Sequence, residues 1–281
     1  MIDVYLYVAF GAGVVAGYLT RWRSPWIDHA ILADVVVLVF SLGALLAALA
    51  VAPLLLAIPL SLGLVTLMLA VTVGLTRVLP RRPPAPGVGR PPRPLGAFIV
   101  VALVVGYAAG RFVTLPAETA VSVTLLILMA LVGFNIRLSW NALRTAPTPL
   151  IAAVTGALVA APIFSLATGF SFRATLATTL GFGFYSLAGP LVTTAIGPLA
   201  GLVAFLTNFF RENLTMVTAP WLGSRIRSEG LTAMGGATTM DTTLYFVTAY
   251  GDREAASMAL ASGLTLTVIA TLAIPLVLAV V

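Results

Sequence analysis

Apolar runs of about 20 residues, the length that crosses a bilayer, recur along this chain and constrain its fold more than any other feature. Hydrophobic residues make up 60% of the 281 residues, and charged residues only 9%. A soluble protein of this length cannot bury so many apolar runs in one core. The sequence therefore predicts an all-α polytopic membrane protein, because helices satisfy their backbone polar groups within lipid.

We expect eight full crossings and two polar segments that are broken or re-entrant within the membrane. The polar segments, at about 174–196 and 231–249, both contain glycines and hydroxyl-bearing residues. If both segments crossed fully, there would be ten crossings instead. The eight expected crossings are 3–20, 31–50, 54–78, 96–113, 119–136, 147–168, 198–221 and 256–281.

The arginines favour eight crossings. Arginine in short loops marks the cytoplasmic side of a membrane protein. With eight crossings twelve arginines face the cytoplasm, and with ten crossings the number falls to ten. We therefore expect a plasma-membrane protein with both termini outside and a cytoplasmic segment at 80–95, which is rich in proline and arginine.

Weak internal repeats indicate how the chain is organised. At an offset of 90 residues, the region before position 79 resembles the region that starts at 96, and each copy holds an odd number of helices, so the second copy is inverted. At an offset of 54, Thr194–Gly197 resembles Thr248–Gly251. The expected parts are a three-helix repeat at 1–79, a linker at 80–95, an inverted repeat at 96–170, and a core region at 171–281 with units at about 174–221 and 231–281.

The strongest candidate for a functional site is the stretch that ends on Asp241. Gly235 and Gly236 can unwind a helix there, and Thr238 and Thr239 add hydroxyl groups. Ionisable residues at membrane depth usually face protein or water and mark ion or substrate pathways. The alternative is a structural Asp that caps a helix start.

A polar stripe in the seventh crossing is the second candidate. Asn208, Arg211, Glu212 and Thr215 recur at helical spacing and so share a broad face. We expect them to line the transport pathway, and the opposite charges suggest a pair between Arg211 and Asp241. The alternative is a buried ion pair that only orients two helices.

Further candidates lie in the first polar segment and the fifth crossing. Tyr185 and Ser186 offer hydroxyls that could bind a substrate or water, and Asn135 offers an amide. Such residues also pack commonly between membrane helices. Glycines at which we expect hinges or unwinding are Gly181, Gly183, Gly189, Gly235 and Gly236.

Several kinds of site are not expected. The chain has no cysteine and a single histidine, His29, so neither a metal site nor a catalytic triad is predicted. Gly181 and Gly183 follow no strand and form no nucleotide fingerprint. We expect no cofactor and no nucleic-acid partner, and a homo-oligomer is left open.

The chain resembles the LysO lysine exporter family. The resemblance is carried by 181–189, by Asn208–Glu212, and by the stretch Gly236-Ala237-Thr238-Thr239-Met240-Asp241. It implies export of L-lysine and toxic analogues such as thialysine, driven by an ion gradient, with an essential acidic residue at Asp241. The chain departs from the family near the end of the second helix. The resemblance implies an acidic residue there, whereas this chain has Ala47-Ala48-Leu49-Ala50, and the nearest carboxylate in the same helix is Asp34.

These features predict a secondary transporter and not an enzyme. The expected mechanism is alternating access, in which protons, or alternatively sodium ions, exchange with L-lysine or a related amino acid. A carrier of another amino acid, or of an organic anion bound at Arg211, is the alternative. An intramembrane protease is a remote one, because Asp34 and His29 are poorly placed to assist Asp241.

Overall fold

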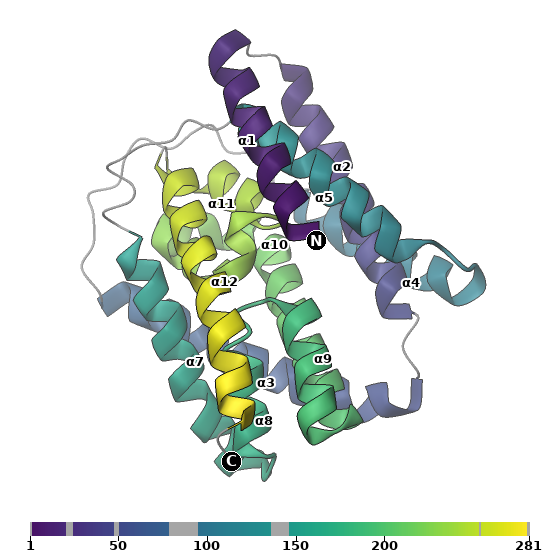
Figure 1. The fold of residues 1–281 in the computed structure, drawn as a ribbon, viewed down its shortest axis with the longest axis vertical. Coiled ribbons are helices and arrows are strands. Elements are labelled where there is room, and N and C mark those ends of the chain that lie inside the picture. The colour runs from purple at the N-terminus through teal and green to yellow at the C-terminus, as the bar shows by residue number, and fades with distance from the viewer. Residues whose placement is uncertain are drawn as a thin grey trace. The chain divides into compact units, whose positions relative to one another are not determined.

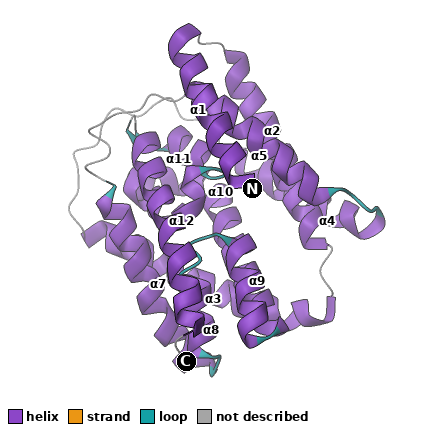
Figure 2. Ribbon diagram, viewed as in Figure 1, coloured by secondary structure: helices purple, strands orange, loops and turns teal. Residues whose placement is uncertain are grey.

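A computed structural model of the chain describes residues 2–20, 25–47, 51–78, 95–135, 146–252 and 254–279. The described residues form helices joined by loops, with no strand among them (Figure 2), which confirms the all-α class. Three described helices are long and apolar enough to cross a membrane: Leu54–Val78, Pro147–Thr168 and Ala255–Ala279. The expected linker at 80–95 lies outside the described residues, apart from Leu95, which begins a helix.

Contacts divide the chain into two compact units. Unit 1 comprises 1–50 and 91–138, and unit 2 comprises 51–90 and 139–281. Each three-helix stretch expected from the repeats thus contributes its first two helices to unit 1 and its third to unit 2. Unit 1 holds α1 (Ile2–Thr20), α2 (Pro25–Ala47), α4 (Leu95–Phe112) and α5 (Ala117–Asn135); unit 2 holds α3 (Val51–Val78), α7 (Pro147–Thr168) and every later described element.

Unit 1 is packed through glycines. Helix α1 lies on α5, and α2 lies on α4 and α5. At five glycines a Cβ atom would meet the facing backbone, so only glycine allows the helices to approach this closely. Residue numbers rise together in both pairs of helices, so each pair is parallel. The contacts are Gly13 with Ala130, Gly17 with Phe134, Gly43 with Leu103, Gly106 with Phe40, and Gly110 with Ala44.

Unit 2 is built on α3 and the long helix α10 (Pro198–Gly235). The Ser61 hydroxyl donates to the Val203 carbonyl at 3.2 Å, and Met68 Sδ accepts a hydrogen bond from Arg211 at 3.4 Å. Because both contacts advance along the two helices together, α3 and α10 are parallel. Helix α7 packs mainly against α3 and also contacts α10.

The first polar segment folds as a helical hairpin, here called hairpin 1. It comprises α8 (Phe172–Thr179), a tip at 180–184 and α9 (Tyr185–Ile196). Its two arms lie side by side, because Ala174 and Ala177 of α8 share one buried cluster with Ala188 and Val192 of α9. The break lies where the sequence predicted it.

The second polar segment also doubles back. Helix α10 is interrupted at Arg227, whose φ of 59° and ψ of 175° are not helical. Ser228–Gly235 then leads into a 3₁₀ turn, Gly236–Met240, and into α11 (Leu244–Tyr250). The backbone N–H of Asp252 donates to the Ser228 hydroxyl at 2.8 Å, so the two ends meet. We call residues 228–250 hairpin 2; it begins three residues before the predicted segment because Arg227, and not a glycine, makes the break.

The two hairpins lie end to end along α10 and α12 (Ala255–Ala279), as Figure 1 shows in green and yellow. The first half of α12 contacts hairpin 2, where the Thr239 hydroxyl donates to the Ala259 carbonyl at 2.9 Å. The second half packs on hairpin 1, since Leu266 and Ala270 join the cluster that contains Ala174. Only the tips of the hairpins meet in the middle.

Candidate functional site

A hydrogen bond between two backbone groups connects the tips of the two hairpins. The Ala237 N–H donates to the Phe182 carbonyl at 2.9 Å. This approach needs unusual backbone conformations, with φ of 50° at Phe182, 103° at Gly183 and 66° at Gly236. Glycine adopts such angles without strain, whereas the backbone of Phe182 is strained at this angle and is held there by contacts with its surroundings.

Asn208 of α10 holds the tip of hairpin 1. Its side chain is fully buried, and its amide nitrogen donates to the carbonyls of Thr178 at 3.0 Å and Ala204 at 2.9 Å. Its Oδ1 accepts the N–H of Gly183 at 2.7 Å. The amide thereby supplies partners to backbone groups that the broken helix leaves unpaired.

Arg211, one turn further along α10, holds the tip of hairpin 2. It is 0% exposed, and its Nε and Nη2 donate to the carbonyls of Met234 and Ala233, each at 2.8 Å. These carbonyls end the helical segment before Gly236, where the helix dipole is negative. The guanidinium carbon also lies 5.9 Å from the centre of the Phe182 ring. Arg211 therefore contacts both hairpins, and its predicted pairing with Asp241 stays a prediction.

Glu212 is buried, and its carboxylate lacks a well-formed hydrogen bond to any described residue. The residue is 1% exposed, and neither carboxylate oxygen makes a hydrogen bond of standard geometry with the described residues. The Thr242 hydroxyl lies close enough to act on it as a weak donor, and the Asp241 carboxylate repels it. Burial of a charged carboxylate without a well-formed hydrogen bond costs free energy, so binding of a proton, a cation or a substrate amine at this position would be favourable.

Asp241 follows the tip of hairpin 2 and is partly exposed. Its Oδ1 accepts the N–H of Thr242 at 2.6 Å and the Thr242 hydroxyl at 3.2 Å. The neighbouring threonines are engaged with the protein itself: Thr238 donates to the Gly235 carbonyl at 3.0 Å, and Thr239 donates to the Gly236 carbonyl at 2.7 Å. These threonines thus hold the tip that carries Asp241.

Tyr185 lies at the start of α9, directly after the tip of hairpin 1. It interacts electrostatically with both Glu212 and Asp241. Its ring packs edge-on against Phe205 and Phe209, with centroid distances of 5.2 and 5.8 Å. Phe205, Phe209 and Glu212 share one face of α10 at i, i+4, i+7 spacing. Two carboxylates and an aromatic cluster form a site that suits a cation with an apolar stem.

The structure thus gathers most of the predicted site residues in unit 2. Asn135 belongs to α5 of unit 1, and its side chain and that of Ser186 lie outside the described residues. Two of the predicted unwound glycines, Gly189 and Gly235, are instead helical, because the breaks fall at the flanking tips. Asp34 also lies in unit 1, within α2.

Sequence reasoning missed two contributors to the site. Thr242 was not among the candidates, although its position next to Asp241 was a usable signal. Phe182 contributes a carbonyl and a ring. The usable signal in the sequence was its place between two glycines, Gly181 and Gly183, which favours an unusual backbone conformation. The i, i+4 pair of phenylalanines on α10 could also have been found from spacing.

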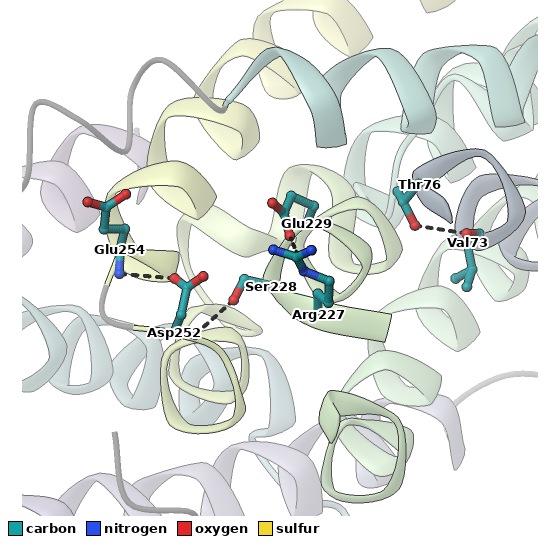
Figure 3. A network of polar contacts seen from close by, with 7 residues as sticks. All are labelled: Val73, Thr76, Arg227, Ser228, Glu229, Asp252 and Glu254. Atoms are coloured by element: carbon teal, nitrogen blue, oxygen red, sulfur yellow. Dashed lines mark hydrogen bonds and ion pairs between the residues drawn. The ribbon is translucent and has the colours of Figure 1, made fainter. Parts of the chain in front are cut away.

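A second polar network lies at the base of hairpin 2 (Figure 3). Arg227 Nε lies 3.8 Å from Glu229 Oε2, and Asp252 Oδ1 accepts the N–H of Glu254 at 3.0 Å. The bond between Asp252 and Ser228 joins the two ends of the hairpin, and the other two contacts each lie within one end. Within the described ranges, no group of three or more His, Cys, Asp or Glu residues is arranged to hold a metal ion.

Comparison with known proteins adds an independent line of information. The model of a protein family described as Lysine exporter LysO matches residues 100–278. A protein of Escherichia coli (strain K12) named Lysine exporter LysO is 29% identical over 185 residues, which cover 62% of this chain and 60% of that protein. A Haemophilus influenzae protein named Putative lysine exporter is 35% identical over 89 residues, or 32% of this chain and 45% of that protein. The matched regions therefore span less than two thirds of either relative, and no solved structure matches the chain.

Proposed function

Because the chain belongs to the LysO lysine exporter family, we propose that it is a secondary transporter that exports L-lysine and analogues such as thialysine from the cytoplasm. One observation carries this proposal: Glu212, a buried carboxylate without a hydrogen bond of standard geometry among the described residues, interacts electrostatically with Asp241 and Tyr185 near the point where two broken helical hairpins meet. Sites of this kind, formed by discontinuous helices between repeats, bind substrates and coupling ions in secondary transporters.

The proposed topology has eight crossings, formed by α1, α2, α3, α4, α5, α7, α12 and the part of α10 before Arg227. Parallel packing of α3 and α10 supports this number. If hairpin 1 is re-entrant, α10 is the seventh crossing and runs in the direction of the third. If that segment crossed fully, α10 would be the eighth crossing and antiparallel to α3. In this arrangement hairpin 1 enters from outside and hairpin 2 from the cytoplasm.

We also propose that the two three-helix stretches, 1–79 and 96–170, are inverted repeats. The glycine contacts support the relation: Gly13 and Gly17 meet α5 as Gly106 and Gly110 meet α2. An exchange of α1 with α4 and of α2 with α5 maps one pair of helices onto the other. The core region at 171–281 would contain the second pair of related units, each with a hairpin followed by a long helix.

Charge exchange at the two carboxylates would provide coupling. A proton or a substrate ammonium group can neutralise one charge of the acidic pair, and each displaces the other. Alternating access would then expose the pair to the cytoplasm through movement of hairpin 2 and to the outside through movement of hairpin 1. Because two neighbouring carboxylates, of which Glu212 is buried, are costly when both are charged, return of the empty carrier would require protons.

The contacts of Arg211 disfavour transport of organic anions at that residue. All three guanidinium nitrogens donate to protein atoms, namely the carbonyls of Ala233 and Met234 and the sulfur of Met68. Three of the five N–H groups of Arg211 are thereby engaged, and the residue is 0% exposed, so the guanidinium already has protein partners and is closed to solvent. The acidic side chains remain the better candidates for a ligand, and they select cations.

The proposal is tested by exchange of labelled lysine in liposomes under an imposed pH gradient. The native protein is compared with Asp241→Asn and Glu212→Gln, which keep side-chain size but remove the charge. We expect gradient-dependent exchange in the native protein and its loss in both variants, with folding retained in detergent. Native protein that leaves lysine unmoved would refute the substrate, and undiminished exchange in both variants would refute the role of the carboxylates.

A further inference from the structure

We propose that Asn208 and Arg211 are positioning residues that lock the tips of the two hairpins to α10 and so fix where Glu212 and Asp241 stand. The two residues are one helical turn apart, at i and i+3, so they project from neighbouring positions on the same side of α10. One turn of a single helix therefore serves both tips. The transport readouts below rest on the proposed function, but the structural one does not.

Asn208 closes the tip of hairpin 1. Thr178, whose carbonyl accepts from the Asn208 amide, lies at the end of α8, whereas Gly183, whose N–H donates to it, lies beyond the turn. One side chain thus bridges both ends of the turn. Gly181 leaves room for this contact, since a Cβ there would come within 2.7 Å of the Asn208 amide atoms.

Arg211 acts as an internal cap on hairpin 2. A positive charge at the C-terminal end of a helix satisfies the last carbonyls and complements the helix dipole. The bonds to Ala233 and Met234 do both at the point where the helix gives way to the 3₁₀ turn. The guanidinium carbon lies over the Phe182 ring, so the same group also interacts with the tip of hairpin 1.

The geometry links these two anchors to the acidic pair. Glu212 follows Arg211 directly, and Asp241 lies four residues beyond Ala237, whose N–H is bonded to Phe182. If Arg211 loses its bonds, the carbonyls of the tip lose their partners in a buried environment, and the tip must move to satisfy them. Asp241 moves with the tip, whereas Glu212 stays on α10.

The test uses the absence of native cysteine. Ala237→Cys, at a position that is 2% exposed, places a thiol at the junction, and Ala153→Cys, at a position that is 0% exposed, places one in α7. Each reporter is combined in the full-length protein with Arg211→Gln, Arg211→Lys or the control Arg225→Gln. Arg225 is exposed and donates to the Trp221 carbonyl within the same helix.

We expect Arg211→Gln to raise the rate of maleimide labelling at position 237 at least about tenfold and to leave labelling at 153 unchanged, since loss of a charge-assisted bond opens only the junction. Arg211→Lys should restore part of the protection, and Arg225→Gln should change neither rate. Equal labelling of native and Arg211→Gln protein would overturn the proposal. So would equal acceleration at both positions, because that result means general destabilisation.

Lysine exchange then separates positioning from direct binding. A displaced acidic pair predicts that Arg211→Gln raises KM for lysine and shifts the pH profile of exchange, with protein of native melting temperature. A raised KM without any change in labelling would mean that Arg211 binds the substrate, and the positioning role would be wrong. If native protein does not exchange lysine, the proposed function fails, yet the labelling result still decides this inference.

Discussion

Gly263→Ala should displace the tip of hairpin 2 and slow transport. Gly263 of α12 packs against this tip, and a Cβ there would lie 2.6 Å from the backbone nitrogen of Met240, below the 3.0 Å that Cβ atoms essentially always keep. The tip and α12 must therefore separate by at least 0.4 Å, the difference between these two distances. A backbone atom cannot rotate away, so the shift is passed on to Asp241, the next residue.

The size of the effect follows from this shift. A misplacement of about 1 Å at a reacting site costs about 100-fold in rate, so a proportional rise in the barrier gives roughly sixfold at the minimum displacement. Overpacking costs about 1–3 kcal/mol of stability, and the helix propensity of alanine offsets up to about 1 kcal/mol of that. We therefore expect a protein that still folds but exchanges lysine at least about sixfold more slowly.

The assay compares Gly263→Ala with Gly74→Ala in the same liposome exchange and in thermal unfolding. Gly74 of α3 also belongs to unit 2, but a Cβ there would meet nothing within 4 Å. The control should therefore exchange at the native rate and unfold slightly later. Native exchange by Gly263→Ala would refute the close contact between α12 and the tip, or the need for Asp241 to stay in place.

Two further predictions concern stability. Gly13→Ala should lower the melting temperature, because its Cβ would meet the backbone of α5. Gly11→Ala in the same helix is the control, since a Cβ there meets nothing within 4 Å and should not lower the melting temperature. Equal melting temperatures of the two variants would contradict the packing of unit 1. Ser228→Ala should lower the free energy of unfolding by about 1 kcal/mol in a denaturation experiment, because the N–H of Asp252 loses its acceptor. Ser122→Ala should have a smaller effect in the same experiment, because the exposed Ser122 hydroxyl bonds within its own helix.

Patterns that depend on side-chain composition could be predicted from the sequence. The helical class and the break in the first polar segment followed from apolar runs interrupted by glycines. The polar stripe was predicted from the spacing of Asn208, Arg211 and Glu212, and the structure does bury all three. The family was recognised from a few motifs near Asp241, which the match to residues 100–278 includes.

Features that depend on main-chain contacts could not be predicted in this way. The break at Arg227 has no glycine or proline to mark it, since an arginine there adopts the left-handed conformation. The role of Arg211 was read as electrostatic pairing because a sequence displays charges and not free carbonyls. The carbonyls of Ala233 and Met234 become visible as partners only once the helix is seen to end at Gly236.

The junction between Ala237 and Phe182 has a consequence for how such a protein can evolve. Its hydrogen bond joins a peptide N–H to a peptide carbonyl, so replacing either side chain leaves both partners in place. Side chains around the junction can therefore drift and retune which cation is preferred, while the architecture that brings the two hairpins together is inherited unchanged. Selection on this joint would fall on the glycine at 236, whose backbone angle and missing side chain the contact requires.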